Sequence, residues 1–267
     1  MDGTTPPVYQ ATGAGMVVLR FFVNAVILAA ELAAIVGAAW LGYHHPVLLA
    51  LLTALIAFGI GLHLDRARLA HDYPFYFEGS VAPSAGLLTL VATGDALLKA
   101  LLGGLVALLT FSGTDLDRRF WTAVVFGVAI FAGSSLLRRL SRSLDARPSR
   151  WGYFRLSVPL GFVFSCGVAL LAWIGEVKIA TLSEIGRQIV FELPQKPTVD
   201  QISELLFGLR QYIDGVVASL LSTVLPVDWA QIASLALSVN VLTGFVAAIY
   251  AVVIAEAVQT LERGARV

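Results

Sequence analysis

Three ionisable residues, Glu31, Asp95 and Lys99, lie near the middle of long apolar stretches of this sequence. An ionisable side chain at the centre of a bilayer costs about 2.5 to 3.5 kcal/mol on insertion scales, so each one needs a partner or a function. Asp95 and Lys99 are four residues apart, which makes them neighbours on one face of a helix. We therefore expect a charged site inside the membrane-spanning part of the chain.

The depth of these residues can be estimated from the rise of an α-helix. Glu31 is fourteen residues past Val17, where the first apolar stretch begins. Lys99 is thirteen residues past Gly86, where the third stretch begins. At 1.5 Å per residue both lie about 20 Å along helices that cross in the same direction. The sequence thus predicts a cluster of Glu31, Lys99 and Asp95 between these two helices.

Two interpretations of this cluster stay open. In the first, Lys99 only neutralises Asp95 so that the helix can insert, and Glu31 is protonated or paired. In the second, the cluster is a hydrophilic site for an ion, a proton or a polar substrate, because a desolvated carboxylate without a matching cation can exchange protons. Asn24 in the first apolar stretch and Asn240 in the last one extend the polar path that the second interpretation predicts.

Other chemistry has weaker support in the sequence. The four histidines cannot be placed in facing pairs at one depth, as bis-histidine haem requires. The zinc-protease motif and strand-linked phosphate-binding glycines are missing, and no serine nucleophile has a histidine at its depth. The single cysteine, Cys166, has no partner for a disulfide. We expect no cofactor, metal or catalytic residue, and an intramembrane enzyme is a minor alternative.

The composition is that of an integral membrane protein. Hydrophobic residues make up 58% of the 267 positions and charged residues only 13%, whereas soluble domains carry about 25% charged residues. The formal net charge is zero, which gives no indication of a nucleic-acid partner. Arginine supplies 15 of the 18 basic residues, and with the Ala- and Gly-rich composition this favours a bacterial cytoplasmic membrane as the location.

Six apolar stretches are long enough to cross a hydrocarbon core of about 30 Å as helices. Membrane β-barrels need strict alternation of apolar and polar residues, and the sequence has none. We therefore predict an all-α transmembrane bundle, with residues 1–16 as a short cytoplasmic tail and 17–267 as one transmembrane domain. The expected spans are 17–41, 46–64, 86–111, 120–137, 156–175 and 232–257.

The placement of basic residues predicts the orientation of these spans. Six arginines lie between Arg138 and Arg155, and the positive-inside rule places this connection in the cytoplasm. With alternating spans, eleven basic residues then fall inside and six outside. Both termini are therefore expected in the cytoplasm.

The segment 176–229 is expected outside, with amphipathic helices between the fifth and sixth spans. A first apolar periodicity covers 182–193, and a capping box of Thr198 and Gln201 begins a second helix that continues to residue 225. This second helix could lie flat on the outer membrane surface, cover the mouth of the bundle or pack against its copy in a homo-oligomer. Arg210 and Asp214, spaced i to i+4, make it a poor span. A seventh crossing or a re-entrant hairpin over 205–225 is the alternative.

Several features predict contacts with the bilayer or with other chains. Small residues at helical spacing on the second, fifth and sixth spans, Gly161 and Gly244 among them, favour close helix packing inside the chain or against another subunit. We expect the lipid bilayer as surroundings, and a homo-oligomer or other membrane or cytoplasmic subunits as partners. The surfaces expected to meet such partners are Arg138 to Arg155, Arg66 to Ser84 and the external helix 198–225.

The layout resembles the permease subunits of ABC-2-type exporters, which have six helices, both termini inside and external helices between the fifth and sixth. The resemblance is one of topology, so it implies no site residues; an N-terminal interfacial helix common in that family has no room before Val17. We predict an integral-membrane transport protein, a permease or channel subunit for a polar solute, an ion or a proton. The alternative is a non-catalytic anchor or assembly subunit of a larger membrane complex.

Overall fold

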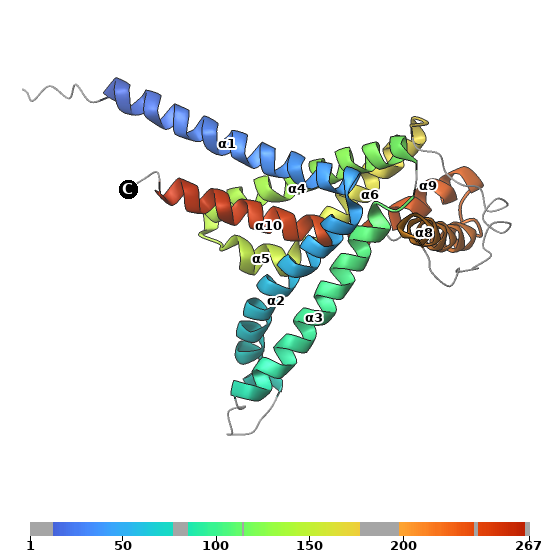
Figure 1. Ribbon diagram of the computed structural model, residues 1–267, viewed down its shortest axis with the longest axis horizontal. Helices are drawn as coiled ribbons and strands as arrows, with labels where there is room; N and C mark the ends of the chain where they lie inside the picture. The colour runs from blue at the N-terminus through green and yellow to red at the C-terminus, as the bar shows by residue number, and fades with distance from the viewer. Residues whose placement is uncertain (1–12, 77–84, 114, 177–197, 238–239, 265–267) are drawn as a thin grey trace, which may run out of the picture.

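The computed structural model describes residues 13–76, 85–113, 115–176, 198–237 and 240–264, and all regular structure in them is helical (Figure 1). In chain order the helices are α1 (Gly13–His44), α2 (Pro46–Tyr76), α3 (Ala85–Thr110), α4 (Leu116–Leu144), α5 (Pro148–Arg155), α6 (Ser157–Trp173), α8 (Val199–Leu221), α9 (Val227–Leu237) and α10 (Asn240–Gly264). Among the described residues the all-α prediction is confirmed.

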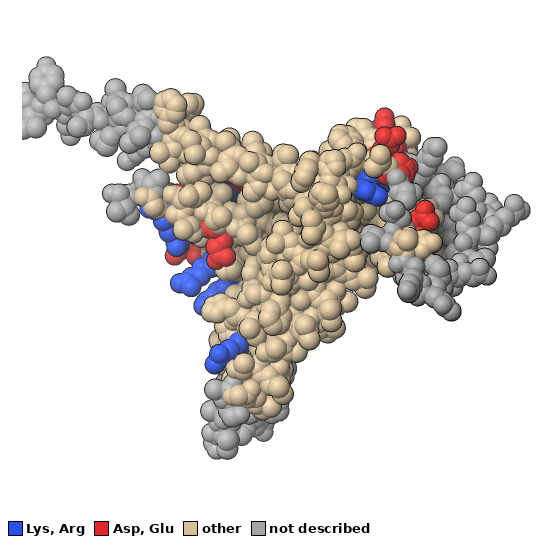
Figure 2. Space-filling view, in the orientation of Figure 1, with Lys and Arg blue, Asp and Glu red and all other residues tan. Residues whose placement is uncertain are grey.

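Five of the described helices, α1, α2, α3, α4 and α10, are long and apolar enough to cross a membrane. The pair α5 and α6 would make a sixth span if it is counted as one, although it bends by 59° at its break. Figure 2 shows charged side chains gathered toward the two ends of the molecule, with an uncharged surface between them. These features are those of a multi-pass helical membrane protein.

The helices form a splayed bundle (Figure 1). α10 packs against α6, α4, α5 and α1, while α2 and α3 form a hairpin that runs away from the rest of the bundle. The hairpin touches the rest of the molecule through α10, α1 and α5, and α3 also touches α8. Helices α8 and α9 lie together at the end of the molecule that is opposite to the C-terminal end of α10.

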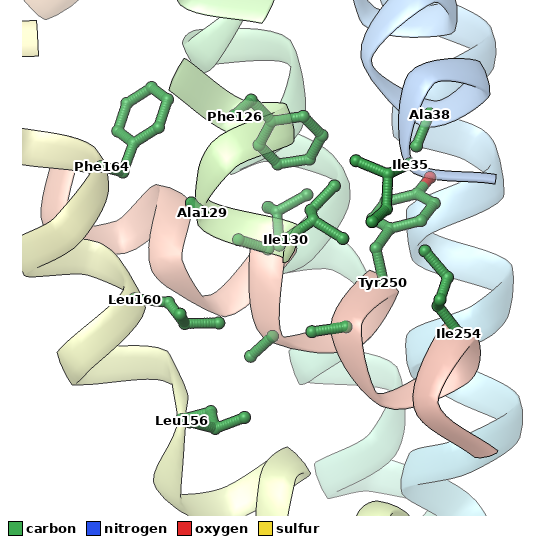
Figure 3. Packing of buried hydrophobic residues seen from close by; sticks show 14 of the residues in the cluster. Ile35, Ala38, Phe126, Ala129, Ile130, Leu156, Leu160, Phe164, Tyr250 and Ile254 are labelled. Carbon is green, nitrogen blue, oxygen red and sulfur yellow. The ribbon is translucent and has the colours of Figure 1, made fainter. Parts of the chain in front are cut away.

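The core surrounds α10, the most buried of the candidate spans (Figure 3). Phe126 and Ile130 of α4 are fully buried, and the Phe126 ring meets the Tyr250 ring of α10 edge-on at a centroid distance of 6.1 Å. Phe164 of α6 and Ile35 of α1 belong to the same cluster. Dispersion contacts in this cluster hold helices that gain no hydrophobic advantage over lipid.

The backbones of α6 and α10 approach each other closely at Gly161 and Gly244. A Cβ on Gly244 would lie 2.0 Å from the Ser157 carbonyl oxygen and 2.1 Å from the Gly161 backbone nitrogen. A Cβ on Gly161 would lie 2.1 Å from the Val241 carbonyl oxygen. Packing within the chain therefore accounts for the small residues predicted on these two spans.

Helices continue where the sequence predicted connections. α2 runs on to Tyr76 and includes Pro74 in its last turn. α4 extends to Leu144 and ends at Asp145, which has a positive φ of 51°. The arginine-rich connection is thus mostly helical. Near the C-terminus, the stretch predicted as the sixth span, 232–257, is divided between α9 (227–237) and α10 (240–264).

The capping box predicted for the external segment is present at the start of α8. The Thr198 amide donates to Gln201 Oε1 at 2.9 Å, and the Thr198 side chain accepts from the Gln201 amide. α8 is not among the helices apolar enough to span, and Val216 and Leu220 of its expected apolar face are 43% and 67% exposed. The first periodic stretch, 182–193, lies outside the described residues.

Candidate functional site

A charged cluster lies between α2 and α3, where Lys99 is bonded to two carboxylates. Lys99 Nζ donates to Asp65 Oδ1 at 2.6 Å and to Asp95 Oδ2 at 2.8 Å. The neighbour relation of Asp95 and Lys99 follows from their spacing of four residues on α3. Asp65 comes from the facing helix, 34 residues earlier. We call these three residues the Asp65 cluster.

Aromatic rings of α5 cover the ammonium group of this cluster. Lys99 Nζ lies 5.4 Å from the ring centroid of Phe154 and 5.8 Å from that of Tyr153, distances at which a cation is attracted to the ring face. The Tyr153 hydroxyl donates to the Ala57 carbonyl oxygen of α2 at 3.3 Å. The cluster is therefore the place where the hairpin meets α5.

Asp65 is held in an unusual environment for a carboxylate. Its side chain is 2% exposed, and its Oδ2 atom is buried with no hydrogen-bond partner among the described residues. Gly61, one turn earlier, lets the Tyr153 ring pack close to α2: a Cβ there would lie 2.7 Å from the Tyr153 hydroxyl oxygen and 3.5 Å from Asp65 Oδ2. A buried acceptor without a donor is destabilising by about 1 to 3 kcal/mol.

The formal charges of the Asp65 cluster do not balance. Two carboxylates share one ammonium, which leaves one negative charge beside the buried Asp65 side chain. A proton or a small cation at Asp65 would remove both the excess charge and the missing hydrogen bond. Asp95, whose side chain is 45% exposed, is the more accessible carboxylate. The arrangement suits reversible binding of a proton or a cation.

The structure places Glu31 away from this cluster. Its carboxylate accepts from the Arg138 guanidinium and from the Ser134 hydroxyl of α4, the latter at 2.9 Å. α1 packs mainly on α4, whereas Lys99 lies in the interface of α2 with α3. The predicted cluster of Glu31 with Lys99 and Asp95 is therefore not formed, because equal depth did not determine which helices are neighbours.

Glu31 instead belongs to a balanced network that joins three helices. Arg138 Nη2 donates to Glu262 Oε1 of α10 at 3.0 Å. Arg142 Nη2 donates to the same oxygen at 2.6 Å. Two guanidinium groups and two carboxylates leave no net charge. This network is suited to fixing α1, α4 and α10 against one another.

The two predicted asparagines lie at different places. Asn240, at the start of α10, is 1% exposed and accepts from the guanidinium of Arg210 of α8. Asn24 is exposed on the surface of α1. Among the described residues, the hydrogen bonds of the Asp65 cluster involve neither asparagine. The continuous polar path from Asn24 to Asn240 is thus divided among separate interfaces.

Arg210 attaches α8 to the ends of two spans. Its Nη1 atom donates to the carbonyl oxygens of Leu109 at 3.1 Å and Thr110 at 3.0 Å, at the end of α3. Its side chain is buried, and desolvation lowers the pKa of Arg210 below the usual guanidinium value, against the opposing effect of Asp214. In the sequence analysis, Arg210 served only as an argument against a seventh crossing of the membrane.

Sequence reasoning did not select Asp65, Arg138 or Glu262 as site residues. Asp65 comes directly after the predicted second span, Arg138 entered only as a basic residue at a span end, and Glu262 was not considered. A usable signal was present, because a buried carboxylate such as Glu31 without a cation on its own helix requires one from another helix. Within the described ranges, no group of three His, Cys, Asp or Glu residues is arranged to hold a metal ion.

Comparison of the chain with protein-family models, with curated proteins and with solved structures found no match. The comparisons therefore add nothing to the resemblance of layout to ABC-2-type permeases. Any functional conclusion depends on the geometry of this chain.

Proposed function

We propose that this chain is a membrane transport protein that passes a proton or a small cation through the Asp65 cluster. The observation that carries the proposal is the unmatched negative charge at a carboxylate that is 2% exposed and has a buried oxygen without a donor. An ionisable side chain inside the membrane is costly, so it is by default a candidate for an ion or proton path.

The contrast with the Glu31 network supports this assignment. There, two carboxylates meet two guanidinium groups, and Ser134 supplies a further hydrogen bond to Glu31. A purely structural ion pair is expected to be balanced in this way. The Asp65 cluster lacks this balance, and its lysine can move on a flexible stem, as a gate for an exchanging cation would require.

For orientation, we propose six crossings with both termini in the cytoplasm, which counts α5 with α6 as one bent span. In this orientation the arginines in the last turns of α4 and in α5 face the cytoplasm, as the positive-inside rule expects. α8 and α9 then lie on the outer side. A bacterial cytoplasmic membrane is the proposed location, on the strength of the arginine-rich composition.

The test is ion flux into liposomes that contain the purified full-length chain. An inside-negative potential is imposed, and uptake is followed for protons with pyranine and for Na⁺ and K⁺ with their indicator dyes. We expect uptake of one of these cations above that of protein-free liposomes. Uptake equal to that of protein-free liposomes for all three would contradict the proposal.

The alternative function, a membrane anchor or assembly subunit, is favoured by one observation on α1. Asn24 is exposed on a helix surface where Phe21, Phe22 and Val26 are 64% to 71% exposed. An amide facing lipid is unfavourable unless another chain bonds it. Purification in mild detergent distinguishes the two functions: a stoichiometric second subunit, lost in Asn24→Leu, supports assembly, and a stable isolated chain with ion flux supports transport.

A further inference from the structure

The last turns of α4 carry a polar groove that the proposed transport does not use. Its volume is about 420 Å³, and arginines and serines line it. The lining residues are three and four positions apart, which places them on one face of the helix. They are Ser135, Arg138, Arg139, Arg142 and Ser143.

The charges around this groove favour an anion. The charges of Arg138 and Arg142 are balanced by the carboxylates of Glu31 and Glu262. Arg139, which also lines the groove, adds one positive charge in excess. The Arg139 carbonyl oxygen accepts from the Ser143 hydroxyl at 2.8 Å, but its guanidinium makes no hydrogen bond or ion pair with any residue that the structure describes. The C-terminal end of a helix disfavours an anion, but the excess positive charge and the guanidinium donors of the groove oppose that weak dipole.

The length of α4 places the groove at the level of lipid headgroups. Between Arg119 and Arg138 the helix has no charged residue, and this interval of 19 residues measures about 28 Å at 1.5 Å per residue. A hydrocarbon core is about 30 Å thick. If Arg119 marks one membrane surface, the groove lies at the other.

The same face of α4 continues toward the membrane centre as exposed apolar surface. Phe131 and Val128, which are four and seven residues before Ser135, are 44% and 56% exposed. A ligand in the groove would thus meet arginines at its head and apolar side chains along its tail. A free phosphate would use only the first of these features.

We propose that the groove binds the phosphodiester headgroup of an anionic phospholipid, with the acyl chains lying along Phe131 and Val128. Arg139 and the free N–H groups of Arg142 donate to the phosphate oxygens, a pairing for which the planar guanidinium is well shaped. Ser135 adds a hydroxyl donor. Glu31 and Glu262 hold Arg138 in place and are not ligands.

Thermal unfolding of the full-length chain in dodecyl maltoside tests the choice of ligand. The midpoint is measured with added dioleoyl phosphatidylglycerol, with dioleoyl phosphatidylcholine and with inorganic phosphate. We expect a rise that saturates with phosphatidylglycerol alone. An equal rise with phosphatidylcholine would overturn headgroup recognition, and an equal rise with inorganic phosphate would assign the groove to a free anion instead.

Native mass spectrometry of variants tests the location. Arg139→Gln should weaken retention of phosphatidylglycerol about tenfold, the loss expected for one charge-assisted hydrogen bond. The matched control is Arg150→Gln, which removes an exposed arginine of α5 outside the groove and should change retention by less than about twofold. Equal weakening in both variants, or none in Arg139→Gln, would overturn the site, and neither side chain holds the fold together.

Discussion

Glu31 of α1 and Arg138 of α4 form an ion pair 107 residues apart in the chain, and the Glu31 side chain is completely buried in it. The pair joins the first span to the fourth at the same point where Arg138 reaches Glu262 of the last span. Three helices far apart in sequence are thereby fixed at one depth. We expect this pair to be structural, in contrast to the Asp65 cluster.

A double-mutant cycle measures the strength of this pair. Arg138→Met leaves the buried Glu31 without a cation and should lower the free energy of unfolding by about 3 kcal/mol or more. Glu31→Gln keeps the Ser134 hydrogen bond and should cost less. The double variant should be more stable than the sum of the two losses predicts, with a coupling energy of about 1 to 3 kcal/mol from denaturation in mixed micelles. Additive losses would show that the pair contributes nothing.

The contact of Gly161 with Gly244 makes a prediction about assembly of the bundle. Gly244→Ala places a methyl group 2.0 Å from the Ser157 carbonyl oxygen, so α6 and α10 must separate, and most of the protein should aggregate in size-exclusion chromatography. Gly59→Ala on α2 is the matched control, since a Cβ there meets nothing within 4 Å. A monodisperse Gly244→Ala variant would be inconsistent with this packing.

The attachment of α8 through Arg210 can be tested by hydrogen exchange. Lysine cannot reach Asn240 and the two carbonyl oxygens of α3 at once, so Arg210→Lys should speed amide exchange in α8 about tenfold through local opening. Glu204→Gln, at an exposed position of the same helix, should leave exchange unchanged. Protection of α8 that is the same in wild type and Arg210→Lys would mean that other contacts hold the helix.

Composition and periodicity predicted the helical membrane class and the α8 capping box, because these depend on local chemistry. The i to i+4 relation of Asp95 and Lys99 was predictable for the same reason. The partner of each charge was not, since Asp65 meets Lys99, and Arg138 meets Glu31, only through the packing of separate helices. The sequence predicts how far along its helix a residue lies, but not which helices lie side by side.

Helix ends in charged segments were predicted poorly. The run of arginines after residue 137 suggested a loop, yet arginine is a good helix former, and α4 continues to Leu144. The break comes at Asp145 and Pro148, where the backbone itself prevents a regular helix. Charge therefore predicted a connection at this place without predicting where the helix ends.

The central claim is that the Asp65 cluster carries the transported cation, and flux through matched aspartate variants tests it most directly. Asp72 lies two turns after Asp65 on α2, in an exposed ion pair with Arg68 at 3.2 Å. In proteoliposomes, Asp65→Asn should reduce cation uptake about tenfold or more, as expected when an essential ionisable group is lost, while Asp72→Asn should keep the wild-type rate. Wild-type uptake by a correctly folded Asp65→Asn protein would contradict the account.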